Sequence, residues 1–168
     1  SSAAEIVVTA QKREQSLQDV SLAVTAVGAD RLTDNQVNNL SDLQTVVPSL
    51  SVGQRQSAAN TNFFIRGFGN GANNAGIEPS VGVFVDGVYR SRITSRISDL
   101  PDIQRVEVLR GPQSTLFGKN ASVGVISIVT QEPQFEFGGL VEGSYRNYDS
   151  IVGKALVTGP LSDSVAVS

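Results

Sequence analysis

Residues able to carry out covalent or metal chemistry are scarce in this chain. Its 168 residues include no cysteine and no histidine, which excludes thiol catalysis, zinc–thiolate sites and Ser-His-Asp catalysis. The acidic residues do not gather into a metal cage or an acid–base pair. Asp99 and Asp102 stand near the expected start of a helix, where capping explains them. The sequence therefore offers no candidate catalytic residue, metal ligand or cofactor site.

A segment at residues 111–120 superficially resembles a phosphate-binding loop. Six residues separate Gly111 from Gly118, which is longer than the spacing that this motif requires. Asn120 stands where a serine or threonine would hold Mg²⁺. The sequence therefore argues against a nucleotide site.

Two arginines have more specific surroundings. Arg66 and Arg110 each end an apolar stretch and each precede a glycine. One interpretation is an ordinary solvated arginine at the end of a strand. The other is a guanidinium group that leaves the domain to pair with carboxylates on another surface, where bidentate pairing gives orientation as well as energy. The residues alone leave both interpretations open.

Charge and composition argue against nucleic acid as a partner. The net charge is −3 and the pI is about 4.9, and there is no basic stripe or aromatic stacking platform. Charged residues make up 17% of the chain, below the roughly 25% of an average soluble protein. Gly, Ser, Asn, Val and Thr take their place, a composition that favours strands and tight loops over long surface helices.

The first half of the chain predicts a strand, two short helices and a long loop. Alternation over residues 21–27 predicts the strand. Asp30 is the expected N-cap of the first helix and Ser41 that of the second, which Pro48 stops. Residues 54–79 are rich in Asn, Gly, Ala and Ser, and the tract 70–76 within them is expected to be an exposed loop.

The second half predicts the centre of a sheet. Asp86 and Gly87 lie between two alternating runs, which is the strongest local signal for a hairpin. Asp99 is expected to begin a short helix through Ile103, and residues 105–109 alternate as a strand. Residues 123–130 are almost continuously apolar, as a buried central strand should be. We therefore expect a small α+β domain with a mixed sheet, short helices and long loops.

The pattern changes after Pro133. Apolar and polar residues alternate over 135–145 and 151–158, with tight turns expected at 146–149 and 159–160 and a third strand starting near the C-terminus. Strands of about 10 residues that alternate in this way are typical of transmembrane β-barrels. A soluble antiparallel meander alternates in the same way, so the tail alone leaves both possibilities open.

Four segments, in order along the chain, resemble the plug domain of TonB-dependent outer-membrane receptors. The most characteristic is Glu107–Asn120, with the sequence EVLRGPQSTLFGKN. The others are Ile65–Gly67 (IRG), Val83–Tyr89 (VFVDGVY) and Gly124–Thr130. The resemblance covers essentially the whole chain, with the plug extending to about Pro133 and barrel strands after it.

The resemblance implies a receptor in the bacterial outer membrane, whose plug fills a lipid-embedded barrel and faces the periplasm. It divides the chain into a TonB-box segment with its linker at residues 1–20, a plug at 21–133 and the first antiparallel strands of the barrel at 134–168. Such receptors import a large scarce nutrient, such as a ferric siderophore. TonB drives the import together with ExbB and ExbD at the inner membrane. We therefore expect a transport receptor rather than an enzyme.

The resemblance also places the TonB box near the N-terminus. The segment that is similar to this box consists of Glu5, Ile6, Val7, Val8, Thr9 and Ala10. TonB adds a strand to the box, so the box should be extended, β-prone and unpaired.

Further roles follow from the resemblance alone. Plug arginines of the family pair with barrel glutamates, a role that corresponds to Arg66 and Arg110 here, with Glu107 as a local partner. Residues 68–79 correspond to an apical loop of the plug that faces the substrate. The residues expected to face the substrate are Phe68, Asn70, Asn73 and Asn74.

Two other functions remain open at this level. A chain of this length cannot close a barrel, which leaves a stand-alone plug that binds a ligand or signals without transport. A soluble periplasmic enzyme is the second, although no residue is a candidate nucleophile or base. Receptors for siderophores, haem, cobalamin and glycans share this plug, so the plug does not identify the substrate.

Overall fold

The protein is described from a computed structural model. The described residues are 7–8, 15–16, 18, 20, 23–37, 39–55, 57–69, 79–90, 103–133, 135–146, 150–162 and 165–167. The chain forms two compact units, residues 1–130 and residues 131–168. Within the described ranges, no helix has the length and apolar character needed to cross a membrane.

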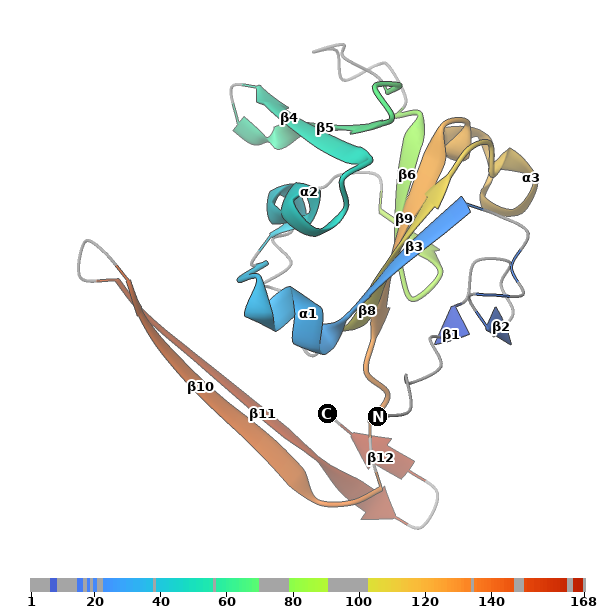
Figure 1. Ribbon diagram of the computed structural model, residues 1–168. Coiled ribbons are helices and arrows are strands. Elements are labelled where there is room, and N and C mark those ends of the chain that lie inside the picture. Colours follow the sequence, from blue (N-terminus) through green and yellow to red (C-terminus); the bar gives the residue numbers. More distant parts are fainter. Residues whose placement is uncertain are drawn as a thin grey trace. The chain divides into compact units, whose positions relative to one another are not determined.

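A five-stranded mixed sheet is the framework of the first unit (Figure 1). Its strands are β3 (Ala23–Gly28), β6 (Val81–Val85), β7 (Val88–Tyr89), β8 (Ile103–Arg110) and β9 (Gly124–Thr130). Their order across the sheet is β3-β8-β9-β6-β7. Strand β8 runs antiparallel to β3 and β9, whereas β6 runs parallel to β9. Strand β9 thus has a neighbour on each side, which accounts for its almost continuous apolar sequence.

The predicted hairpin at Asp86 and Gly87 is confirmed, and it connects β6 to β7. Both residues have positive φ angles, 48° and 77°, as a two-residue turn of this kind requires. The Asp86 carboxylate also accepts hydrogen bonds from the backbone N–H of Thr130, at 2.8 Å, and from its hydroxyl, at 2.9 Å. The turn is thereby fastened to the last residue of β9.

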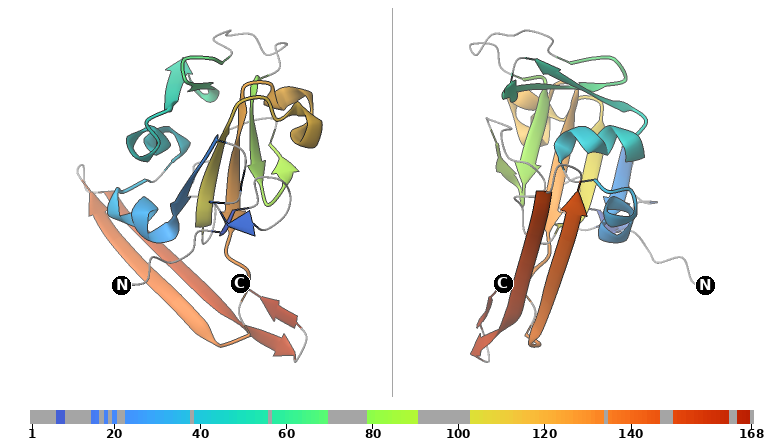
Figure 2. Two further views of the ribbon diagram at one scale, coloured as in Figure 1. Left: turned by 45° about the vertical axis from the view of Figure 1, so that its right-hand side comes forward. Right: turned by 90° about the vertical axis from the view of Figure 1, so that its left-hand side faces the viewer.

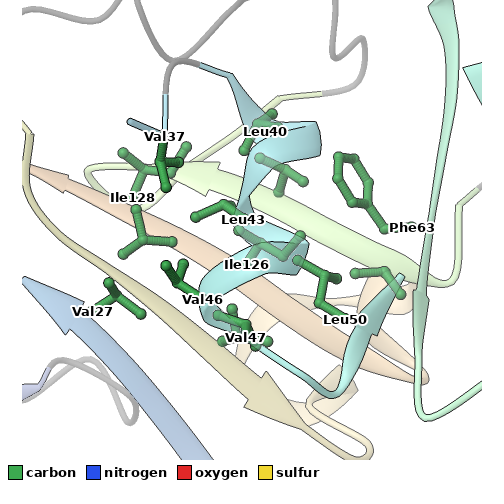
Figure 3. Close-up of a cluster of buried hydrophobic side chains, with 14 of the residues drawn as sticks. Val27, Val37, Leu40, Leu43, Val46, Val47, Leu50, Phe63, Ile126 and Ile128 are labelled. Atoms are coloured by element: carbon green, nitrogen blue, oxygen red, sulfur yellow. The ribbon is translucent and has the colours of Figure 1, made fainter. Parts of the chain in front are cut away.

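Short helices and a hairpin cover one face of the sheet (Figures 1 and 3). They are α1 (Ala29–Asp34), η1 (Leu40–Asp42), α2 (Leu43–Val46), β4 (Leu50–Arg55) and β5 (Ser57–Ile65). Their apolar side chains meet those of the sheet in a buried cluster, which we call the helix-side core. Figure 3 shows its members Val27, Val37, Leu40, Leu43, Val46, Val47, Leu50, Phe63, Ile126 and Ile128.

The expected helix caps were wrong in detail. Gly28 is the N-cap of α1, and Asp30 lies within its first turn. Asn39 caps the next helical segment instead of Ser41, because its side-chain oxygen accepts the backbone N–H groups of Ser41 and Asp42. Asp42 in turn accepts the N–H of Asn39, which completes a capping box.

Part of the stretch that is rich in Asn, Gly, Ala and Ser forms a strand, whereas the loop expected at residues 70–76 lies outside the described residues. Strand β5 occupies Ser57–Ile65 and pairs antiparallel with β4, placing Phe63 opposite Val52 and Ile65 opposite Leu50. The apolar end of β5 is anchored in the helix-side core, and main-chain pairing satisfies the polar remainder. Residues 70–78 lie outside the described residues.

The helix expected from Asp99 to Ile103 is not seen where the chain is described. Ile103 is the first residue of β8, and residues 91–102 lie outside the described residues. The alternation expected at 105–109 therefore extends over the eight residues of β8.

A second, smaller cluster covers the opposite face of the sheet, on the side where Figures 1 and 2 show α3. Its covering elements are α3 (Ser114–Phe117), η3 (Lys119–Ala121), β1 (Val7–Val8) and β2 (Gln15–Ser16). The buried members of this cluster are Val8, Phe84, Leu109, Ala121 and Val125. The sheet therefore has an apolar layer on each face.

The second unit is a three-stranded antiparallel sheet. Its strands are β10 (Gly138–Arg146), β11 (Ser150–Ser162) and β12 (Val165–Val167). The turn expected at Gly159 and Pro160 was wrong, because β11 continues through both residues to Ser162. Pairing with β10 ends at Thr158, and the register with β12 shifts after Pro160. Proline is accommodated where a ladder ends or bulges in this way.

Candidate functional site

Arg110 marks one end of the central sheet. It is the last residue of β8 and lies opposite Ala23 of β3 and Gly124 of β9. Its Nε donates a hydrogen bond of 3.2 Å to the carbonyl oxygen of Ala23. Side chains alternate along a strand, so Arg110 projects on the same face as Val108, a member of the helix-side core.

Arg66 follows the strand β5 in a tight turn. The N–H of Ile65 donates to the carbonyl of Phe68 at 2.8 Å, and the N–H of Phe68 returns to the carbonyl of Ile65 at 3.0 Å. Arg66 and Gly67 occupy the turn with φ angles of 53° and 81°. A left-handed conformation favours glycine and is strained for arginine. An arginine is nevertheless present at this position, and its side chain is exposed.

The fold brings these two arginines to the same end of the sheet. A Cβ atom added to Gly124 would stand 2.5 Å from Cδ1 of Ile65, so Ile65 packs directly over the strand partner of Arg110. Arg66 is the next residue after Ile65. We call this region, with its two guanidinium groups, the arginine end. Among the described residues, neither guanidinium is ion-paired with a carboxylate.

Glu107 was expected to be a local partner of these arginines, and the structure shows it in an ion pair with Arg105. Glu107 is completely buried and forms an ion pair with Arg105, in which Oε1 and Nε are 2.8 Å apart. Arg105 and Glu107 are two residues apart on one strand, so both project on the same face. Arg110 projects on the other face. The alternation of β8 therefore places Glu107 and Arg110 on opposite faces of the sheet.

The carboxylate of Glu107 lies in the middle of the sheet. Its neighbours across the strands are Ala26 on β3 and Ser127 on β9. Sequence reasoning missed Arg105, which supplies its cation, and it also missed the bonds that Asp86 makes to Thr130. In both cases the partner is set by strand register, which the local pattern does not contain.

Two residues of the expected TonB box are described, and they form a strand that is paired. Val7 pairs with Ser16 and Val8 pairs with Gln15 in an antiparallel ladder. Val8 is also completely buried, whereas Val7 keeps 40% of its surface exposed. The remaining residues of the expected TonB box, Glu5, Ile6, Thr9 and Ala10, lie outside the described residues.

The expected substrate-facing loop is described only at its start. Phe68 follows the Arg66–Gly67 turn and keeps 72% of its surface exposed. Asn70, Asn73 and Asn74 lie outside the described residues, so their role stays a prediction. An exposed aromatic ring beside an exposed arginine supplies an apolar face and a positive charge for recognition.

The described residues favour recognition over chemistry at this site. Within the described ranges, no three residues of the types His, Cys, Asp and Glu gather into a group able to hold a metal ion. The features that stand out are two outward-facing cations and a short N-terminal strand. Both kinds of feature act by pairing with another surface.

Comparison with known proteins decides the family. The family model described as "TonB-dependent Receptor Plug Domain" matches residues 16–125, well over half of the chain. The chain belongs to the TonB-dependent receptor plug family. It is 35% identical to the pesticin receptor of Yersinia pestis over 161 residues, which is 95% of this chain and 24% of that receptor. It is 32% identical to the ferripyoverdine receptor of Pseudomonas aeruginosa over 162 residues, 94% of this chain and 19% of that receptor.

Solved structures agree with this assignment. The ferric yersiniabactin uptake receptor from Yersinia pestis aligns with a TM-score of 0.75 and 34% identity, over 84% of this chain and 22% of that chain. The ferripyoverdine receptor of the outer membrane of Pseudomonas aeruginosa aligns with a TM-score of 0.76 at 22% identity, covering 94% of this chain and 20% of that one; at that identity the likeness shows the fold alone. The plug fold is confirmed, and the chain spans about a quarter of the length of the curated pesticin receptors that it matches.

Proposed function

We propose that this chain is the plug end of an outer-membrane receptor that actively imports a ferric siderophore. The observation that carries the proposal is the match to the plug family over residues 16–125, together with relatives named for pesticin and ferripyoverdine. A further relative is named as an iron-regulated outer membrane virulence protein of Vibrio cholerae. The first two of these relatives are named as receptors, which favours transport over an enzymatic role.

In this proposal the arginine end holds the plug in place. Arg66 and Arg110 pair with carboxylates of the barrel that surrounds the plug. The plug faces the periplasm. The support is that both cations lie at one end of the sheet without a carboxylate partner among the described residues. The strained φ of 53° at Arg66 also supports a role for its side chain, because strain of this kind persists at functional positions.

The second unit begins the barrel. The register of β10 with β11 sets Val141 beside Ala155 and Tyr145 beside Ile151 on one face. Large side chains on this face are exposed, with 87% of the surface of Val141 and 80% of that of Ile151 accessible. An apolar face of this kind suits the lipid of the outer membrane. We accordingly propose that the barrel begins near residue 134 and that lipid covers this face.

TonB is the proposed energy partner, acting with ExbB and ExbD at the inner membrane. It adds a strand to residues 5–10. Main-chain hydrogen bonds carry most of the affinity in this kind of binding, so an extended segment is sufficient. Residues 11–20 then serve as the tether between this segment and the plug domain at 21–133. Strand β1 within the segment shows that Val7 and Val8 adopt the extended conformation that this requires.

The test of transport is uptake of radioactive iron carried by a siderophore. Cells that express the complete receptor are expected to accumulate iron from a recognised ferric siderophore, and deletion of TonB should abolish accumulation while surface binding persists. Uptake that continued at the same rate without TonB would overturn the proposal. Cells without the receptor provide the background rate.

The test of the TonB box is direct binding. A peptide of residues 1–12 is expected to bind the purified periplasmic domain of TonB in isothermal titration calorimetry. A peptide of the same composition in scrambled order is the control. Absence of binding by the native peptide would remove the assignment of residues 5–10.

A further inference from the structure

The chain turns back along β5 immediately after that strand ends. The main chain of Ile65 is hydrogen-bonded in both directions to that of Phe68, at 2.8 and 3.0 Å, whereas β4 lies on the other side of β5. The two residues between them, Arg66 and Gly67, both have positive φ angles, which is typical of a two-residue hairpin turn. Gly69 therefore lies beside β5, on the side away from β4.

Gly69 lies too close to β5 for any other residue to fit. A Cβ atom built at this position would stand 2.3 Å from the carbonyl oxygen of Phe63 and 3.0 Å from Cα of Phe64. Both are main-chain atoms, so no change of side-chain rotamer relieves the contact. Gly69 is not among the glycines with a positive φ angle. Close packing, and not backbone conformation, is therefore what requires glycine here.

The aromatic ring of Phe64 covers this glycine. Phe63 and Ile65 belong to the helix-side core, so the alternation of β5 places Phe64 on the other face, where it is half-buried. Its Cδ1 atom is 2.9 Å from the Cβ position built at Gly69, and its Cε2 atom is 3.3 Å from that built at Gly53 of β4. These two atoms are opposite corners of the ring. Phe64 thus spans from β4 to the segment after the turn, and an aromatic ring placed over glycine stabilises strand pairing of this kind.

The segment expected to face the substrate begins at this contact. Phe68, which keeps 72% of its surface exposed, is fixed by its bonds to Ile65, and residues 70–78 start directly after Gly69. A binding segment with a rigid base loses less conformational entropy when it meets a ligand than one with a loose base. Phe64 is not a member of the helix-side core, so its ring serves this base.

We propose that Phe64 is a positioning residue for substrate recognition. Its ring holds Gly69 against β5 and so fixes the base of the segment expected to face the substrate. It acts through Phe68 and the residues after Gly69 and does not itself touch the substrate. This inference rests on the proposed function, because it takes a ferric siderophore as the ligand, and it adds the residue that pre-organises this part of the site. Loss of order at one residue of the base corresponds to about a tenfold rise in Kd.

The first experiment examines the base of the segment without a ligand. Amide hydrogen exchange is compared between the native complete receptor in detergent micelles and its variants Phe64→Leu and Gly69→Ala. The amides of Ile65 and Phe68 are expected to exchange about tenfold faster in both variants, whereas those of β8 and β9 keep their native rates. Native exchange rates at Ile65 and Phe68 in both variants would overturn the inference.

Two further variants serve as comparisons. Phe117→Leu removes another half-buried ring, which packs against Phe84 on the opposite face of the sheet. It is the matched control and should leave the exchange of Ile65 and Phe68 unchanged. Gly53→Ala meets only the far end of the Phe64 ring, so its effect should be smaller than that of Gly69→Ala.

The second experiment measures recognition itself. Cells that lack TonB and carry the complete receptor are incubated with radioactive ferric complexes as probes. The probes are those of yersiniabactin and pyoverdine, which the similar structures name, together with hydroxamate and catecholate siderophores. The Kd of a probe that the native receptor binds is expected to rise about tenfold in Phe64→Leu and Gly69→Ala, with the number of binding sites unchanged. Phe117→Leu should keep the native Kd.

The outcomes separate this inference from the proposed function. A native Kd in Phe64→Leu and Gly69→Ala, together with faster exchange, would overturn the role of Phe64 in recognition and leave the proposed function intact. A native receptor that bound none of the probes would overturn the proposed ligand class, and the role in recognition with it. A higher Kd together with faster exchange at Ile65 and Phe68 is the result that supports the inference.

Discussion

A carboxylate with no exposed surface lies at the centre of the plug sheet. Glu107 is held by Arg105, whose side chain is 13% exposed, at 2.8 Å. Removing two charges from water costs free energy that their attraction only partly returns. Such a pair therefore contributes little net stability, but loss of one member leaves a charge buried among apolar neighbours such as Leu109 and Ala26.

We predict that Arg105→Met destabilises the plug by about 3 kcal/mol. Amide hydrogen exchange in β8 and β9 should then be about a hundredfold faster, since protection there reports the free energy of opening. The double variant Arg105→Met with Glu107→Gln should recover much of the loss, because no charge stays buried. Arg90→Met, at an exposed arginine, is the matched control and should change stability by less than about 0.5 kcal/mol. Equal exchange rates in the single and double variants would contradict this account.

At the scale of elements, the sequence predicted what local pattern determines. The alternation of β8, the apolar run of β9 and the Asp86–Gly87 turn are each coded within a few residues, and all are found. Strand β5 was missed over residues 57–62 because they are polar or small, and only pairing with β4 makes them a strand. The cap of η1 was placed two residues late because Asn39 and Ser41 are both good caps, and the side-chain geometry decides between them.

The candidate site was predictable to the same extent. The positions of Arg66 and Arg110 at strand ends were readable in the sequence, and the fold then brought them to one end of the sheet. The pairing of Glu107 and the burial of Val8 were not readable. Each depends on contacts between segments far apart in the chain. The sequence pattern around a hydrophobic residue such as Val8 is the same whether the residue is buried or exposed.

The strands β10, β11 and β12 form an element whose apolar face has no cover within its own unit. The surfaces of Phe137 and Val141 are 86% and 87% exposed. In water, such a face is unfavourable and the outer strands have unpaired edges. The element therefore needs lipid or further strands to be stable.

We predict that residues 135–167 of the isolated 168-residue chain are poorly protected in detergent-free solution. Their amides should exchange at least about a hundredfold faster than those of β8 and β9, which serve as the internal control in the same sample. Adding detergent micelles should slow exchange in β10 and β11 and leave β8 unchanged. Strong protection across β10–β12 without detergent would indicate a soluble sheet instead of the start of a barrel.

At the scale of the whole plug, the contact of Val8 with the sheet and the arginine end lie on opposite faces of the same two strands, β8 and β9. Leu109 and Val125 are strand partners that receive Val8 on one face. The next pair along the same strands, Arg110 and Gly124, belongs to the arginine end on the other face. A change in the twist or register of β8 against β9 therefore moves both contacts, which gives a short physical route between them.

We predict that Arg110→Ala loosens the plug in the complete receptor. Loss of one member of a largely desolvated charge pair costs about 2–5 kcal/mol, so amides of β3 and β8 should exchange at least about tenfold faster. Permeability to large antibiotics should increase. Arg31→Ala, which removes an exposed arginine from α1, is the control and should change none of these measurements. Arg110→Lys keeps the charge but not the bidentate geometry, and its values should be intermediate. Unchanged permeability together with unchanged exchange in Arg110→Ala would show that Arg110 does not hold the plug.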